Sequence, residues 1–482
     1  MAEGFNKKEV TRSLSDETRH IRWPWLVGAL ISFSLLVGLL LFAWAPGGVS
    51  STRPIGSLED VERLAEREDL NVLFILLDTL RADRLTPYGY ERDTSPHLAA
   101  LAEEGIRFDR HLAQSSWTKA SMASMWTGLY PMRAGITRFD QVIPEDAKLP
   151  AERLSEAGFD TVGLYRNGWV SPNFGFGQGF DIYVKPGGRP MDPSVRRDNP
   201  TIKGSFSDED VLYSAMEYLR VNGQGHWFLY LHLMDIHEYT YDEESALFGG
   251  DYSDVYDNSI RRVDALLGAL FDFLDAQGLS DRTLVVVASD HGEAFRERGF
   301  EGHARAVFRE STEVPLLIRF PFRLEPGIVV SSRSRNIDIW PTLLDLLGLE
   351  GPSLTDGQSL VDVILAEGRG QSDEQMDLGI SHLDTTWGRP DMPSRHAVAV
   401  VDGPYRYVRH TAGPSVQESL FDAEEDPLEL QDLAEEQPEK LIELRARGAE
   451  YLETSPAWGE ASTREIGEME LNQLRALGYA IP

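Results

Sequence analysis

The sequence predicts an α/β fold: a large, mostly parallel sheet flanked by helices, with a smaller C-terminal α+β subdomain and one transmembrane helix ahead of it. Two apolar runs carry this prediction. Residues 71–77 and 284–289 are rich in Val, Leu and Ile, as are strands that are buried on both faces of a sheet. Stretches with helical periodicity lie between such runs, and this alternation is typical of a sheet covered by helices on both sides.

The other elements of this domain are expected at regular intervals. Helices are predicted at residues 96–105, 149–158, 208–221, 255–277 and 338–347, and further strands at residues 160–165, 226–232 and 314–320. The helix at 255–277 has the clearest pattern, because Ile260, Val263 and Leu267 recur on one face.

The chain divides into five segments. A polar tail (1–22), an apolar segment (23–46) and a linker (47–69) precede the α/β domain (70–350) and the C-terminal subdomain with its acidic helical tail (351–482). In the last segment the pattern weakens. Short antiparallel strands are predicted there at 397–401 and 405–409, followed by a helix at 438–452.

The apolar segment predicts a membrane anchor. Residues 25–45 contain no charge, and about 21 residues of helix span about 31 Å, enough for the hydrocarbon core of a bilayer. Lys and Arg residues are frequent before the segment and sparse after it. By the positive-inside rule the N-terminus is then cytoplasmic, and we expect a single-pass protein of the cell inner membrane with a periplasmic main domain.

A cleaved signal peptide is the alternative for the same segment. Ala43-Trp44-Ala45 resembles a cleavage site. Pro46 follows it directly, however, and the apolar run is long for a signal peptide. The sequence therefore favours an anchor that is retained.

Composition excludes several classes of function. Lys and Arg number 46 against 78 Asp and Glu, which gives a net charge of −32. Such a surface repels nucleic acid, so no nucleic-acid partner is expected. The chain has no cysteine, which excludes disulfides, thiolate metal sites and a thiol nucleophile.

Polar side chains follow the apolar runs at the points where the predicted strands end. Asp78 follows the first run, and Asp290 and His291 follow the run at 284–289. Asp235 and His237 come after a third strand, and if that strand continues they face the same side. Because parallel strands deliver their carboxyl ends to one edge of a sheet, these side chains are expected to meet there.

These residue types favour a divalent metal ion. Oxygen and imidazole ligands without thiolates suit Mg²⁺, Mn²⁺, Ca²⁺ or Zn²⁺. His303 is a further candidate, and whether one ion or two is bound depends on whether Asp235 and His303 converge.

Thr118 is the candidate nucleophile. It lies at the front of a predicted helix, where Ser and Thr are expected as N-cap residues and where free N–H groups favour an anion. A metal nearby lowers the pKa of such a hydroxyl.

The chain from about residue 71 to the C-terminus resembles the sulfatase-type branch of the alkaline-phosphatase superfamily. The resemblance rests on several motifs in one order. These are Leu77-Asp78-Thr79-Leu80-Arg81-Ala82-Asp83, Trp117-Thr118, Thr127-Gly128-Leu129-Tyr130-Pro131, Met234-Asp235-Ile236-His237, Ser289-Asp290-His291-Gly292-Glu293 and Gly302-His303.

The resemblance implies a role for each candidate residue. It implies a metal bound by Asp78, Asp290 and His291, with Asp235 as an additional ligand for a second ion. It places Thr118 at the position of the nucleophile, and His237 and His303 where the family contacts the oxygens of the ester or a second metal. Lys119 and Asn167 are expected to line the substrate pocket.

The nucleophile motif departs from that of sulfatases. Those enzymes oxidise a Cys or Ser to formylglycine within a Cys/Ser-x-Pro-Ser-Arg signature, whereas this chain reads Thr118-Lys119-Ala120-Ser121-Met122. Oxidation of Thr would give a ketone in place of the aldehyde. Thr nucleophiles are typical of the relatives that cleave or transfer phosphoryl groups.

Four functions follow from these observations. We expect a metal-dependent hydrolase that cleaves phosphate or related esters outside the cytoplasm through a Thr nucleophile. The alternatives are a transferase that moves a phosphorus-containing headgroup onto a glycan or lipid, a sulfuric ester hydrolase without formylglycine, and a non-catalytic binding protein on a degenerate fold.

Overall fold

The fold is described from a computed structural model of the chain. It covers residues 53–187, 206–371, 378–389, 391–412 and 415–475, all of which belong to one compact unit. Within this part of the chain, no helix is long and apolar enough to cross a membrane. The predicted anchor at residues 23–46 lies outside the described residues.

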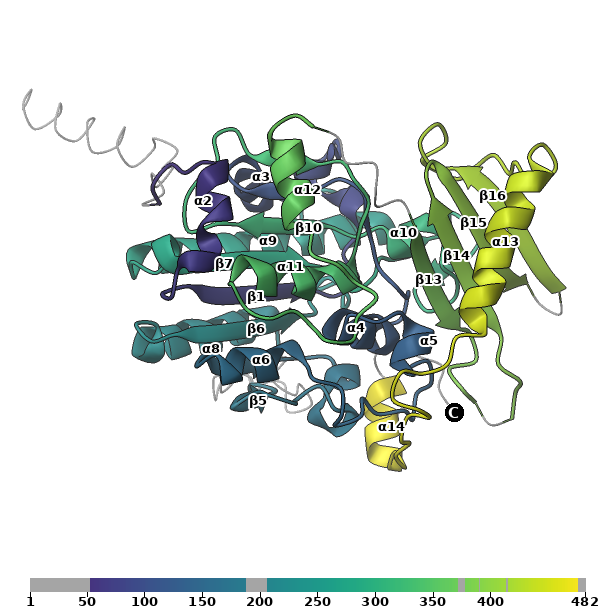
Figure 1. Cartoon of the computed structure of the whole chain (residues 1–482), viewed down its shortest axis with the longest axis horizontal. Coiled ribbons are helices and arrows are strands. Elements are labelled where there is room, and N and C mark those ends of the chain that lie inside the picture. The colour runs from purple at the N-terminus through teal and green to yellow at the C-terminus, as the bar shows by residue number, and fades with distance from the viewer. Residues whose placement is uncertain (1–52, 188–205, 372–377, 390, 413–414, 476–482) are drawn as a thin grey trace, which may run out of the picture. The chain divides into compact units, whose positions relative to one another are not determined.

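The core is an eight-stranded sheet with the order β11-β2-β10-β7-β1-β6-β4-β5 (Figure 1). Its strands are β1 (Asn71–Leu77), β2 (Ile106–Phe108), β4 (Asp160–Leu164), β5 (Ile182–Val184), β6 (Trp227–Leu233), β7 (Thr283–Ala288), β10 (Leu316–Arg319) and β11 (Ile328–Val330). Strand β10 runs antiparallel to both of its neighbours, while the remaining pairs are parallel. The sheet is therefore mixed, with one reversed strand in an otherwise parallel order.

Helices cover both faces of this sheet, since β1 is completely buried and is apolar in every position after Asn71. One face packs on α4 (Thr118–Thr127), α6 (Pro150–Glu156), α11 (Ile339–Leu346) and α12 (Val361–Gly368). The other packs on α3 (Pro96–Glu103), α8 (Asp208–Asn222) and α9 (Tyr252–Ala276). Successive residues of β1 alternate between the two cores, with Phe74 in the first and Ile75 in the second.

Short elements complete this part of the chain. They are α2 (Leu58–Glu62), β3 (His111–Leu112), α5 (Pro131–Ala134), β8 (Ala294–Phe295), β9 (Glu301–Gly302), α10 (Arg309–Thr312) and β12 (Ser334–Arg335). Strands β8 and β9 pair as a small antiparallel hairpin that lies outside the main sheet.

The C-terminal subdomain is a four-stranded antiparallel sheet with one helix packed against it (Figure 1). It comprises β13 (Gly379–Asp384), β14 (His396–Asp402), β15 (Tyr405–Ala412), β16 (Ser415–Asp422) and α13 (Pro438–Leu452), and α14 (Glu468–Arg475) follows. The two predicted strands are thus part of a larger sheet. Strand β13 also reaches the main domain, where Ser381 and His382 donate hydrogen bonds to the carbonyls of Ala113 and Gln114.

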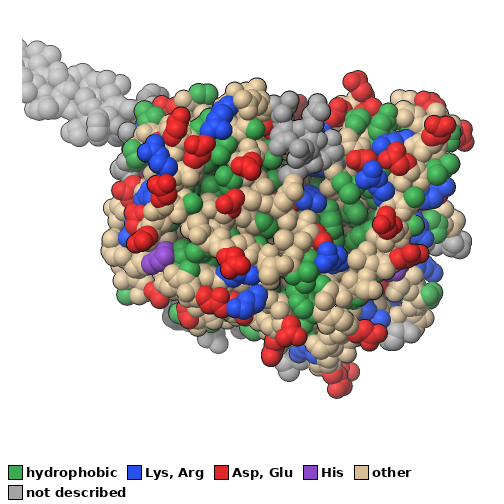
Figure 2. Space-filling view, viewed as in Figure 1, with side chains coloured by type: hydrophobic (Ala, Val, Ile, Leu, Met, Phe, Trp, Pro, Cys, Tyr) green, Lys and Arg blue, Asp and Glu red, His purple; other side chains and the backbone are tan. Residues whose placement is uncertain are grey.

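The acidic composition is visible on the surface. Carboxylates are spread over the face shown in Figure 2 and alternate with Lys and Arg side chains. The carboxylates agree with the net charge of −32 of the whole chain.

Candidate active site

Three predicted metal ligands meet at one edge of the sheet. Strands β1 and β7 are parallel neighbours, with Leu76 opposite Ala288, so the residues that follow them emerge side by side. One ligand atom each from Asp78, Asp290 and His291 lies within 4.8 Å of the others, and all three side chains are buried.

The donor set fits a divalent cation. One oxygen of each carboxylate accepts a hydrogen bond. Asn167 donates to Asp78 Oδ2 at 2.7 Å, and the backbone amide of His291 donates to Asp290 Oδ1 at 3.0 Å. No hydrogen bond from a described residue reaches the second oxygens, Asp78 Oδ1 and Asp290 Oδ2. A buried carboxylate oxygen without a donor is unfavourable unless a cation compensates it. Burial, and then the charge of Asp78, raise the pKa of Asp290 well above its usual range.

His291 presents its unprotonated nitrogen to this group. Its Nδ1 lies 3.0 Å from the carbonyl of Gly292, which can only accept, so Nδ1 carries the proton and Nε2 keeps its lone pair. Burial lowers the pKa of His291 to about 3 and keeps the ring neutral. Gly292 is required here for space, because a Cβ would lie 2.2 Å from the carbonyl oxygen of Glu310.

Thr118 is the first helical residue of α4, and its hydroxyl is turned into the site. The residue that caps the helix is Trp117, whose side chain makes no capping bond, so the expectation of a Ser or Thr N-cap is wrong. The Oγ1 of Thr118 lies 3.1 Å from Nε2 of His291 and 3.4 Å from Nδ2 of Asn167. The candidate nucleophile therefore borders the metal group, at the N-terminus of a completely buried helix.

His237 and His303 lie beside the group. Their rings are 4.9 Å apart, and the ring of His303 lies 4.6 Å from that of His291. Nδ1 of His303 is 3.2 Å from a carboxylate oxygen of Glu293. Burial opposes a charge on His303, but Glu293 more than offsets it, so the pKa of His303 is raised. Burial lowers the pKa of His237.

Asp235 does not join this group. Strand β6 ends at Leu233, and the next residues form a turn in which the amide of Glu238 donates to the carbonyl of Met234. The strand alternation that was expected to align Asp235 with His237 is therefore absent. The Asp235 carboxylate instead accepts from Arg166 at 2.5 Å and lies 3.5 Å from Arg262.

Lys119 and Asn167 have different surroundings. Asn167 bridges the site, since its Nδ2 lies near both Asp78 and Thr118 and its Oδ1 accepts from the amide of Trp169. Lys119 is buried, donates to the carbonyl of Phe139 at 2.6 Å and lies over the ring of Phe174 at 3.7 Å. Burial lowers the pKa of Lys119 well below its usual range.

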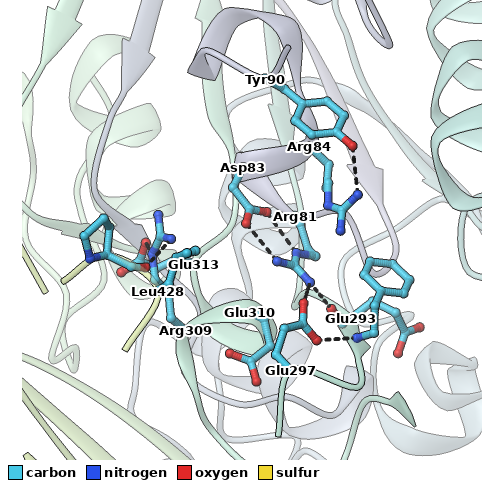
Figure 3. A network of polar contacts seen from close by, with 12 residues as sticks. Arg81, Asp83, Arg84, Tyr90, Glu293, Glu297, Arg309, Glu310, Glu313 and Leu428 are labelled. Atoms are coloured by element: carbon cyan, nitrogen blue, oxygen red, sulfur yellow. Dashed lines mark hydrogen bonds and ion pairs between the residues drawn. The ribbon is translucent and has the colours of Figure 1, made fainter. Parts of the chain in front are cut away.

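Sequence reasoning missed several supporting residues. His232 approaches Asp78 Oδ2 at 3.1 Å, and Glu293 pairs with His303. Arg81 binds Asp83 and Glu297 through its guanidinium and also donates to the carbonyl of Glu293 (Figure 3). The motif that contains Asp78 also contains Arg81 and Asp83. Their closeness to Asp78 in the sequence could have indicated that they lie near the site.

Backbone strain gathers around the same residues. Thr79, Tyr239, Arg296 and Ala304 have positive φ angles of 64°, 52°, 74° and 54°. Thr79, Tyr239 and Ala304 lie within two residues of Asp78, His237 and His303, and Arg296 lies in the β8–β9 turn. The left-handed conformation is unfavourable for side chains of this kind. Tyr256 holds the first of these turns, because its hydroxyl donates to the carbonyl of Thr79 at 2.7 Å.

Comparison with known proteins identifies the class to which this fold and site belong. The family model described as "Sulfatase" matches residues 70–349, and the model "N-sulphoglucosamine sulphohydrolase, C-terminal" matches residues 297–451. The first match covers more than half of the chain. The chain therefore belongs to the sulfatase family, whose members are metal-dependent ester hydrolases, and it is an ester hydrolase of this family.

Individual relatives span most of the chain. An ulvan-active sulfatase of Formosa agariphila is 26% identical over 78% of this chain and 79% of its own length. A choline-sulfatase of Rhizobium meliloti is 26% identical over 76% of this chain and 82% of its own length. Among solved structures, the phosphonate monoester hydrolase of Agrobacterium radiobacter covers 79% of this chain and 96% of its own, with a TM-score of 0.61 and 22% identity. The last likeness shows a shared fold.

Proposed function

We propose that this protein hydrolyses phosphate or phosphonate esters through Thr118 as the nucleophile, with a divalent cation held by Asp78, Asp290 and His291. The observation that carries the proposal is the position of the Thr118 hydroxyl, 3.1 Å from His291 Nε2 at the edge of the Asp/Asp/His group. A nucleophile at a helix N-terminus also has the free N–H groups that favour an anionic substrate.

Each residue of the site has a separate role in the proposed reaction. Asn167 orients the Thr118 hydroxyl and the Asp78 carboxylate. A divalent cation, when bound, supplies Lewis-acid stabilisation that lowers the pKa of the hydroxyl and offsets the charge of the transferred group. The Thr118 hydroxyl releases its proton to solvent, Oγ1 bonds to phosphorus, and the bond from phosphorus to the leaving oxygen breaks. Water then cleaves the Oγ1–P bond of the phospho-threonine and releases phosphate or phosphonate. The leaving oxygen takes a proton from the pair of His237 and His303. Glu293 favours the charged form of His303.

Sulfate ester hydrolysis is the second candidate, and the names of the curated relatives favour it. The side chains along α4 count against it. Thr118 cannot be converted to an aldehyde, and Ala120 and Met122 stand where the sulfatase motif has Pro and Arg. Both positions are buried and uncharged in α4, so no cation replaces the Arg at that position.

Two further parts of the proposal concern partners and location. We propose that residues 23–46 anchor the chain in the inner membrane and that the hydrolase domain is periplasmic, on the strength of the charge pattern around that segment. Transfer of the phosphoryl group to a glycan or lipid acceptor would use the same phospho-threonine, with an alcohol in place of water.

The test combines metal analysis with a nucleophile series. The purified protein is assayed for bound metal and for turnover of phosphodiester, phosphomonoester and sulfate-ester substrates, together with Thr118→Ala and Thr118→Ser. We expect stoichiometric metal and phosphoester turnover, with kcat lowered by at least about 10³-fold in Thr118→Ala and only partly in Thr118→Ser, which keeps a hydroxyl. Full activity of Thr118→Ala would refute the nucleophile, and turnover of sulfate esters alone would refute the substrate class.

A further inference from the structure

One arginine beside the active site differs from its neighbours. Arg296, at the start of the β8–β9 turn, pairs with Glu301 at 2.5 Å, and Arg298 pairs with Glu429 at 3.2 Å. Arg305 lies two residues after His303 and is exposed. Within the described part of the chain, it has no hydrogen bond, ion pair or ring contact. Acidic residues outnumber basic ones 78 to 46, so carboxylates for pairing are abundant.

The guanidinium of Arg305 lies beside Gly302, the residue before His303. A Cβ added to Gly302 would lie 3.9 Å from Nε of Arg305 and 3.7 Å from Oε1 of Glu293. Both groups thus border the same small open space above Gly302, whose φ is +89°. Since Glu293 lies 3.2 Å from His303, this space opens directly beside the histidine that faces the ester.

Two tyrosines lie against the same hairpin, next to Phe295 of β8. Tyr252 is 39% exposed, and its hydroxyl lies 2.5 Å from that of Tyr239. The ring of Tyr252 lies 5.4 Å from Phe295 of β8, so it stands against the hairpin. The charge of Arg305 acts on both His303 and Tyr252. The β8–β9 hairpin therefore has a guanidinium beside Gly302 and an aromatic ring with a pair of hydroxyls beside Phe295.

We propose that Arg305 and Tyr252 form a subsite for a second anionic group, a carboxylate, sulfate or phosphate, on the leaving part of the ester. The inference rests on the proposed function, because it takes the ester to lie between Thr118 and His303. The leaving part then extends past His303 into the space above Gly302. A guanidinium binds such oxygens through paired N–H donors. A local cation is also what an anionic substrate requires on a surface with net charge −32.

The test uses two leaving groups of the same shape and different charge. Phosphate esters of 4-hydroxybenzoate and 4-hydroxybenzamide are compared in the wild type and in Arg305→Gln. We expect the ratio of KM for the carboxylate ester to KM for the amide ester to rise about fivefold in Arg305→Gln. Any change in kcat that follows from the loss of charge near His303 should be the same factor for both esters. The matched control is Arg296→Gln, which removes a charge from the same hairpin that Glu301 already neutralises, and it should leave the ratio as in the wild type.

The outcomes separate this inference from the proposed function. If the wild type hydrolyses sulfate esters and not phosphate esters, the proposed function fails, and the same comparison is made with the sulfate esters of the two phenols. If the wild type hydrolyses neither, binding of 4-hydroxybenzoate and 4-hydroxybenzamide is measured by calorimetry in both proteins. An unchanged KM ratio in Arg305→Gln, or equal binding of the two phenols to the wild type, overturns the subsite.

Discussion

Asn167 lies where the carboxylate of Asp78 and the hydroxyl of Thr118 meet. Its Nδ2 donates to the first at 2.7 Å and lies 3.4 Å from the second, and the amide of Trp169 fixes its Oδ1. Because all three side chains are buried, no water replaces a lost donor at low cost. The side chain thus orients two reactive groups without itself being a predicted ligand.

We expect Asn167→Ala to lower kcat for the phosphoester, or metal affinity, by roughly 10-fold to 100-fold, as is usual when a ligand loses its hydrogen-bond partner. The measurement is kcat and metal content at fixed free metal. Asn173→Ala, which removes an exposed amide bonded to Glu470, is the control. An Asn167→Ala protein with wild-type kcat and metal affinity would contradict the role.

For single residues, the sequence predicted the position of side chains that directly follow apolar strands. The sequence predicted that Asp78, Asp290 and His291 lie together. Each follows directly on an apolar strand, and the two strands are parallel neighbours, so residues that follow them emerge at the same edge of the sheet. Asp235 was misplaced because its strand ends earlier and a turn reorients the side chain. Glu293 and His232 were missed because their roles depend on contacts between residues far apart in the chain.

Among the secondary-structure elements, the β8–β9 hairpin is short and lies between two residues of the candidate site. Each of its strands has two residues, and Glu293 and His303 flank it. Arg81 holds its base from the β1 side, since it contacts the Glu293 carbonyl at 2.8 Å and the Glu297 carboxylate at 2.6 Å (Figure 3). The turn after Asp78 and the hairpin with His303 are therefore joined through one guanidinium.

We expect Arg81→Lys to lower kcat by roughly 10-fold to 100-fold. One ammonium cannot reach Asp83, Glu297 and the Glu293 carbonyl together. The hairpin would then shift, and a displacement of catalytic groups by about 1 Å lowers the rate by about this factor. Since the lysine keeps the charge, KM should change little. The check is a separate determination of kcat and KM with a melting temperature for each protein. A loss of melting temperature with kcat unchanged would show that Arg81 serves the fold alone.

The boundaries of most elements were close to those predicted, since buried strands and amphipathic helices have strong periodicity. Residues 255–277 were predicted as a helix that the structure places at Tyr252–Ala276, and 438–452 agrees with α13. The four-stranded C-terminal sheet was incompletely predicted. Its outer strand β16 starts with exposed polar residues, so it lacks the apolar run on which the other predictions depended.

For the whole molecule, buried histidines link stability to pH. His111 on β3 is buried between Ser334 and Asn336, each 2.8 Å from one ring nitrogen, and burial lowers its pKa to about 3. A histidine whose pKa is lower in the folded state than in the unfolded state binds its proton more readily when unfolded. Its contribution to stability is therefore present above about pH 6.5 and is lost as the pH falls toward 3.

Between pH 6.5 and pH 5 this group should remove about 2 kcal/mol from the free energy of unfolding. We expect His111→Gln, which cannot be charged, to lose about that much less than the wild type over the same interval. Urea unfolding at both pH values measures the difference. Equal losses in the wild type and in His111→Gln would contradict the assignment.

The identity of Thr118 also bears on how the active site matures. A sulfatase whose nucleophile must be oxidised to formylglycine is not active as it is encoded, so its activity depends on a modification made after translation. Here the hydroxyl is encoded directly and lies in place at the first residue of α4. On the proposed function, the site is therefore complete as soon as the chain has folded and bound its metal, in any host and without an auxiliary modifying system.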